Sequence, residues 1–103
     1  MKEVSVEQFK VDLKTGNIYL LDVRNPDEYA FCNLGGVNIP LGLLHDEYTQ
    51  VPKGETVYCR CHHGVRSKVA QDFLSSKGYS DVLNITGGID AWSLRVDESV
   101  KRY

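Results

Sequence analysis

The residues with the clearest potential for chemistry lie together in the segment 57–67 (VYCRCHHGVRS). Its apolar start predicts a short strand, residues 61–66 predict a loop that opens at Cys61 and closes at Arg66, and Ser67 begins a predicted helix. The first amides of a helix have no partner inside it and carry the positive end of the helix dipole. Because both effects favour a thiolate over a thiol, and the thiolate is the nucleophile, the segment predicts thiol chemistry at Cys61.

The rest of the loop is suited to holding an anion beside that sulfur. Consecutive main-chain amides in a tight loop form an anion-binding nest, and Gly64 allows the backbone to curl without a Cβ clash. Arg66 is expected to close the loop with its guanidinium or to pair with an oxyanion of the substrate. The simpler interpretation of Cys61 is a buried, inert thiol. That interpretation does not explain why Gly64 and Arg66 follow it at these positions. We assign Cys61 as the catalytic nucleophile and the substrate-binding role to His62, His63, Gly64, Val65 and Arg66.

Alternating strands and helices must position this loop. Strands are predicted at residues 18–23, in a short segment that stops at Pro40, and at residues 55–59 and 82–85; helices are predicted to begin at Ser5, Asn25, Leu41 and Ser67 and to follow Gly87 and Gly88. The helix at 67–77 has Val69, Ala70, Phe73 and Leu74 as its expected buried face. This order predicts an α/β domain with a mainly parallel sheet, in which active loops lie beyond the carboxyl ends of the strands.

Composition limits the classes of function. A chain of 103 residues predicts one domain over 1–103, with a frayed polar tail at 97–103. The net charge of −2 offers no basic surface for nucleic acid, and no apolar run is long enough for a membrane span. An odd count of three cysteines, with no signal peptide at the start, indicates a reducing compartment, and we expect a cytoplasmic protein.

Four segments, in order, resemble the single-domain rhodaneses of the sulfurtransferase family. They are residues 20–29 (LLDVRNPDEY), 34–40 (LGGVNIP), 61–66 (CHHGVR) and 87–92 (GGIDAW). The chain departs from the family pattern at Cys32-Asn-Leu34, where the family usually has Gly-His-Ile. The resemblance implies a rhodanese-like three-layer fold, a five-stranded mainly parallel sheet with helices on both faces.

The resemblance also implies an activity. In the family, the loop cysteine takes a sulfane sulfur from thiosulfate or a persulfide donor, becomes a persulfide, and passes the sulfur to a thiol or cyanide acceptor. No cofactor is required. A sulfur-relay protein is a further expected partner, although no segment of the chain identifies it.

Two other functions compete with sulfur transfer. A phosphatase or redox enzyme could use the same thiol, but the family's phosphatase relatives have five residues between cysteine and arginine, whereas four lie between Cys61 and Arg66. The shorter loop leaves less room for a tetrahedral oxyanion. The other alternative is a non-catalytic binding module of the same fold. The presence of both Cys61 and Arg66 argues against it, because such modules usually lack the cysteine.

The remaining reactive side chains have simpler interpretations. Cys59 is read as a small apolar residue at the end of a strand, because its separation from Cys61 is difficult for disulfide geometry; a resolving or redox thiol is the alternative. A zinc site is not expected, since Cys59, Cys61, His62 and His63 lie in one tight turn and reach round an ion poorly. We expect Asp22 and Arg24 to form a structural ion pair, and Trp92 and Cys32 to pack in the interior.

Overall fold

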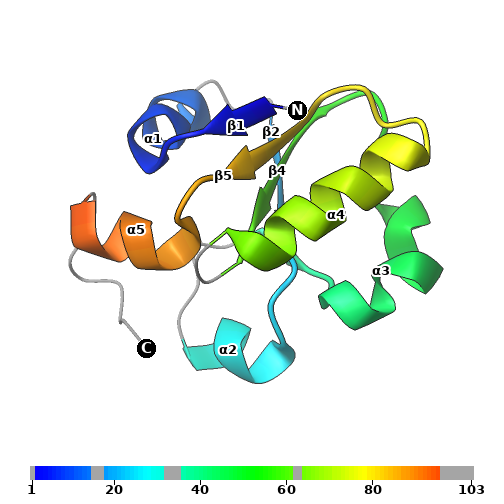
Figure 1. The fold of residues 1–103 in the computed structure, drawn as a ribbon, viewed down its shortest axis with the longest axis horizontal. Helices are drawn as coiled ribbons and strands as arrows, with labels where there is room; N and C mark the ends of the chain where they lie inside the picture. The colour runs from blue at the N-terminus through cyan, green and yellow to red at the C-terminus, as the bar shows by residue number, and fades with distance from the viewer. Residues whose placement is uncertain (1, 15–17, 32–35, 62–63, 96–103) are drawn as a thin grey trace.

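One sheet with helices on both of its faces organises the molecule (Figure 1). The computed structural model describes residues 2–14, 18–31, 36–61 and 64–95. The strands are β1 (Lys2–Val4), β2 (Ile18–Asp22), β3 (Val37–Asn38), β4 (Thr56–Arg60) and β5 (Val82–Ile85). The helices are α1 (Val6–Leu13), α2 (Pro26–Phe31), α3 (Leu41–Glu47), the short 3-10 turn η1 (Tyr48–Gln50), α4 (Val65–Ser76) and α5 (Gly88–Arg95).

The strands lie in the order β1-β5-β4-β2-β3, and every pairing between neighbours is parallel. The predicted α/β class and the five-stranded parallel sheet are therefore confirmed. All carboxyl ends lie along one edge, so the loops after β2, β4 and β5 meet there. Cys61 directly follows β4, which places it at the centre of this edge.

Both faces of the sheet are covered, which explains why its central strands are apolar without alternation. On one face, Val57 and Cys59 of β4 pack with Leu44 of α3 and with Ala70 and Leu74 of α4. On the other, Phe9 of α1 and Trp92 of α5 pack against Tyr58, with ring centroids 5.2 Å apart for Phe9–Tyr58 and 5.7 Å for Phe9–Trp92. The expected packing role of Trp92 is thus confirmed.

Local signals set several boundaries. The Ser5 hydroxyl accepts a hydrogen bond from the Gln8 amide at 3.1 Å, which caps α1. Pro26 is the first residue of α2, as the sequence predicts. Gly78, with φ +92°, ends α4 in the left-handed conformation that favours glycine.

One strand was not predicted, and two expectations need correction. The three-residue strand β1 has no strand pattern of its own in the sequence, and its identity comes from pairing with β5. Helix α4 begins at Val65, two residues before the predicted Ser67, so Arg66 belongs to its first turn. Val69 is 51% exposed instead of buried, while the polar side chains of Ser67 and Gln71 are inside.

No helix in the described ranges has the length and apolarity that crossing a lipid bilayer would require. His62, His63, Cys32 and the predicted tail at 97–103 lie outside the described residues.

Candidate active site

Gly64 shapes the turn between β4 and α4. It is the N-cap of α4, with φ +101°, a backbone conformation that side-chain-bearing residues rarely adopt. A Cβ at this position would lie 3.2 Å from the Gly87 nitrogen and 3.5 Å from the Ile85 carbonyl oxygen. Both the dihedral angle and the close approach of the β5–α5 turn therefore require glycine here.

The Cys61 sulfur faces this turn. The Gly64 N–H donates a hydrogen bond to Cys61 Sγ at 3.0 Å, and the Ser67 hydroxyl lies 3.6 Å from the same sulfur. The Cys61 carbonyl accepts from the Ile89 amide at 2.9 Å, which ties the loop to the start of α5. Cys61 is only 1% exposed. Its sulfur is therefore surrounded by protein, and the Gly64 amide and the Ser67 hydroxyl are two of its described neighbours.

The predicted substrate-binding residues occupy different environments. Gly64 is buried beside the sulfur, whereas Val65 is 73% exposed at the first position of α4. The role of His62 and His63 stays a prediction, because both lie outside the described residues.

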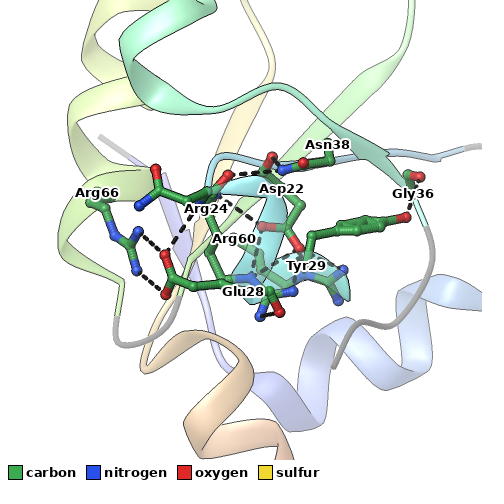
Figure 2. Close-up of polar contacts among 9 residues, drawn as sticks. Asp22, Arg24, Glu28, Tyr29, Gly36, Asn38, Arg60 and Arg66 are labelled. Atoms are coloured by element: carbon green, nitrogen blue, oxygen red, sulfur yellow. Dashed lines mark hydrogen bonds and ion pairs between the residues drawn. The ribbon is translucent and has the colours of Figure 1, made fainter. Parts of the chain in front are cut away.

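Arg66 has a partner that sequence reasoning missed. Its Nη1 and Nη2 donate to Glu28 Oε1 and Oε2 at 2.6 and 2.8 Å, a bidentate ion pair between α4 and α2 (Figure 2). Glu28 Oε1 also accepts from the Asn25 amide at 3.2 Å. These contacts orient the Arg66 guanidinium toward α2, and its expected role as the closing group of the sulfur loop stays a prediction.

Ser67 and Asn84 are two further polar residues of the site that the sequence did not single out. Both side chains are buried, at 0% and 3% exposure, and the Ser67 hydroxyl is hydrogen bonded to Asn84 Oδ1. Asn84 lies on β5 opposite Cys59, so only strand pairing brings it under the Cys61 loop.

A buried charge cluster supports the sheet edge beside the loop. Asp22 binds Arg24 through Nε and Nη2 at 2.9 and 2.6 Å, and Arg60 Nη2 approaches the same carboxylate at 3.1 Å (Figure 2). The predicted Asp22–Arg24 ion pair is confirmed, and Arg60 is an addition to it. Desolvation lowers the pKa of Arg60, as does the nearby Arg24, whereas Asp22 opposes the shift.

Asn38 completes this support from β3. Its side-chain amide donates to the carbonyl oxygens of Asp22 at 3.0 Å and Arg24 at 2.9 Å. The end of β2 is therefore held from both neighbouring strands, which stabilises the edge from which the Cys61 loop leaves.

Cys59 is a core residue, as the sequence favours. It is fully buried, unlinked by a disulfide, and burial raises its pKa to about 12, with a smaller contribution from Cys61. We predict that an alkylating reagent at about pH 8 modifies Cys59 on the order of 10³-fold more slowly in the native protein than in denaturant. Peptide-resolved mass spectrometry would measure both rates, and equal rates would contradict the assignment.

The same shift has a consequence for stability. The folded-state pKa of Cys59 lies above its ordinary value of 9.0. The protonated thiol therefore makes its full contribution to the free energy of unfolding below about pH 9. This contribution falls as the pH rises through 9 toward 12.

A surface pocket of about 380 Å³ lies between α4 and the β1 side of the sheet. Its walls include Glu3, Val65 and Val69, and it reaches the backbone of Gly64 and Gly87. The pocket therefore borders the turn that holds the Cys61 sulfur.

In the part of the chain that the structure describes, His, Cys, Asp and Glu side chains do not gather in a group of three that could hold a metal ion. Among the described groups around Cys61, the Gly64 amide donates to the sulfur and the Ser67 hydroxyl lies 3.6 Å from it. The main-chain amide suits an anionic sulfur.

The structure is a parallel α/β domain with a cysteine in the turn between β4 and α4. The chain belongs to the rhodanese-like domain family, whose family model matches residues 5–95. The resemblance seen in the four sequence segments is thereby confirmed.

Individual relatives agree with this membership. The chain is 35% identical over 104 residues to the adenylyltransferase and sulfurtransferase uba4 of Ogataea parapolymorpha, covering 99% of the chain and 26% of that relative. It is 35% identical over 80 residues to a protein named sulfurtransferase from Allochromatium vinosum, covering 77% of the chain and 75% of the relative. A crystal structure of a rhodanese-related protein from Thermoplasma volcanium superposes with a TM-score of 0.86 at 27% identity, covering 93% of this chain and 94% of that one.

The relatives differ greatly in length. The chain spans only about a quarter of the Ogataea protein but three quarters of the Allochromatium protein. A domain of this family therefore occurs both within larger proteins and as most of a small one.

Proposed function

We propose that this chain is a sulfurtransferase that carries a sulfane sulfur as a persulfide on Cys61. The observation that carries the proposal is the hydrogen bond from Gly64 N–H to Cys61 Sγ, in a loop at the carboxyl edge of the sheet. Membership of the family and the sulfurtransferase names of two relatives support the same reaction class.

The first half of the reaction loads the protein. The Cys61 thiolate attacks the outer sulfur of thiosulfate, the bond between the two donor sulfurs breaks, and sulfite leaves with the electron pair. The product is a Cys61 persulfide whose terminal sulfur is anionic. A persulfide donor reacts in the same way and leaves as a thiolate.

The second half unloads it. Cyanide or a thiolate attacks the terminal sulfur, the sulfur–sulfur bond on Cys61 breaks, and its electron pair returns to Cys61 as a thiolate. Thiocyanate or a new persulfide is released. The acceptor in the cell is a small thiol or a thiol of a sulfur-relay protein, and no resident cofactor takes part in either half.

Intact mass spectrometry tests the proposal. After incubation with thiosulfate, or with glutathione persulfide as a second donor, the protein is expected to gain the mass of one sulfur atom and to lose it on addition of cyanide. Cys61→Ser is expected to lower the rate of loading by about 10³-fold or more, since it removes the nucleophile. Cys59→Ser, a change of the neighbouring core thiol, serves as the matched control and should still load.

Two results would overturn the assignment. An unchanged mass with both donors would indicate a binding module of the same fold. Cys61-dependent hydrolysis of a phosphate ester, without sulfur loading, would indicate a phosphatase.

A further inference from the structure

Asn84 contacts both the backbone and the hydroxyl that surround the Cys61 sulfur. Its Nδ2 donates to the Gly64 carbonyl oxygen at 3.2 Å, and its Oδ1 faces the Ser67 hydroxyl. The Gly64 carbonyl defines the orientation of the amide, because the reverse orientation would place two carbonyl oxygens against each other. Asn84 Oδ1 is therefore the atom that Ser67 meets.

The Ser67 hydroxyl has one proton and three neighbours that could accept it. These are Asn84 Oδ1, the Gly64 carbonyl oxygen at 3.2 Å and Cys61 Sγ at 3.6 Å. The Gly64 carbonyl already accepts from Asn84 Nδ2 and from the Lys68 amide, each at 3.2 Å. The proton is best used on Asn84 Oδ1, so that an oxygen lone pair of Ser67 faces the sulfur.

This arrangement distinguishes the chemical states of Cys61. A Cys61 thiol can donate its proton to the Ser67 oxygen. In a Cys61 persulfide the sulfur attached to Cβ is neutral and needs no hydrogen-bond donor. A free Cys61 thiolate is stabilised if the Ser67 hydroxyl donates to it. That hydrogen bond would leave Asn84 Oδ1 without its donor. The amide and the thiolate therefore compete for a single hydroxyl proton.

We propose that Asn84 is a positioning residue that accepts the Ser67 hydroxyl proton and so keeps Ser67 from donating it to Cys61. This inference rests on the proposed function, in which Cys61 alternates between thiolate and persulfide. Because Asn84 accepts the Ser67 proton, the Cys61 thiolate lacks this hydrogen-bond donor. The Cys61 persulfide does not need the donor, so the thiolate is destabilised relative to the persulfide. A less stabilised thiolate is the stronger nucleophile toward a sulfur donor.

The pH dependence of Cys61 alkylation by iodoacetamide tests the proposal, with peptide-resolved mass spectrometry to follow Cys61 alone. Asn84→Leu frees the Ser67 hydroxyl to donate to the thiolate, so the midpoint of the pH–rate profile is expected to fall by about one unit. Ser67→Ala alone should not raise the midpoint, because Ser67 does not donate to the sulfur in the native protein. In the double variant the fall caused by Asn84→Leu should disappear.

The charged surroundings of Cys61 are unchanged in these variants. The ionisable groups on the described elements around the site include Cys59 on β4, the Arg66–Glu28 pair between α4 and α2, and the cluster of Asp22, Arg24 and Arg60. Glu3, Lys68 and Asp72 also line the pocket beside Gly64 and Asn84. His62 and His63 also stay in every variant. Differences between the profiles therefore report on the hydroxyl and the amide.

Gln71→Leu is the matched control. It removes another buried amide, one that donates to the Val82 carbonyl at 2.8 Å, and should leave the Cys61 midpoint where it is. A midpoint that is unchanged or raised in Asn84→Leu would overturn the proposal. If that variant does not fold, Ser67→Ala decides alone: a midpoint raised by about one unit would mean that Ser67 donates to the thiolate, contrary to the proposal.

Alkylation needs no sulfur donor, which separates the two hypotheses. Failure of the native protein to gain sulfur would contradict the proposed function without changing the alkylation profiles. Failure of the profiles to shift would contradict the role of Asn84 in a protein that still loads sulfur.

Discussion

Replacing Asp22 by asparagine is expected to lower the free energy of unfolding by about 3–5 kcal/mol. The substitution keeps the shape of the side chain but removes the carboxylate charge that Arg24 and Arg60 share. All three side chains are at most 1% exposed, so water cannot replace the lost charge without opening the sheet edge. The change is a large fraction of the roughly 5–15 kcal/mol that stabilises a typical domain.

Chemical denaturation followed by circular dichroism would measure this effect, and Arg60→Met is the matched control. That variant removes one of the two cations and leaves Asp22 paired with Arg24, whose Nη2 lies 2.6 Å from the carboxylate. Burial already disfavours the charge on Arg60, as its lowered pKa indicates. We expect a loss of about 1–2 kcal/mol or less for Arg60→Met. Equal losses in the two variants would show that packing, and not charge balance, stabilises the cluster.

Gly64→Ala is expected to slow sulfur loading of Cys61 by about 10²–10³-fold, because it disturbs the amide that donates to the sulfur. The new Cβ would press on the Gly87 nitrogen at 3.2 Å, and the φ of +101° is strained for alanine. The same strain should lower the free energy of unfolding by about 1–3 kcal/mol. Loading followed by intact mass, together with a denaturation curve, separates the effect on the site from the effect on the fold.

A second glycine provides the control. Gly54, in the turn before β4, would meet nothing within 4 Å if it carried a Cβ. Gly54→Ala should therefore load sulfur at the native rate and unfold at nearly the native midpoint. Native loading by Gly64→Ala would contradict the role given to this main-chain donor.

The elements that local residue patterns could predict are those whose signals lie within a few neighbouring residues. The apolar run at β2, the Asn25–Pro26 start of α2 and Gly78 at the end of α4 all carry such signals, and all agree with the structure. The strand β1 carries two charged residues in three and becomes a strand only by pairing with β5. The start of α4 depended on the left-handed backbone of Gly64, which residue type permits but does not require.

The error at Val69 has a related cause. Helical spacing placed it in the core with its apolar neighbours, yet it is 51% exposed and Gln71 is buried. The buried amide is tolerated because it donates to the Val82 carbonyl of β5. Hydrophobic periodicity contains no information about such a partner, which lies on another element.

For the site, the order and spacing of residues alone predicted the Cys61 loop, its position beyond the carboxyl end of a strand, and the family to which the chain belongs. Chemistry confined to one short segment is visible in the segment itself. Only the tertiary structure decided that Arg66 binds Glu28, that Arg60 shares Asp22, and that Asn84 reaches Ser67 beneath Cys61. These contacts join residues 17 to 38 positions apart, and their geometry depends on parallel strand pairing and helix packing, which no local pattern encodes.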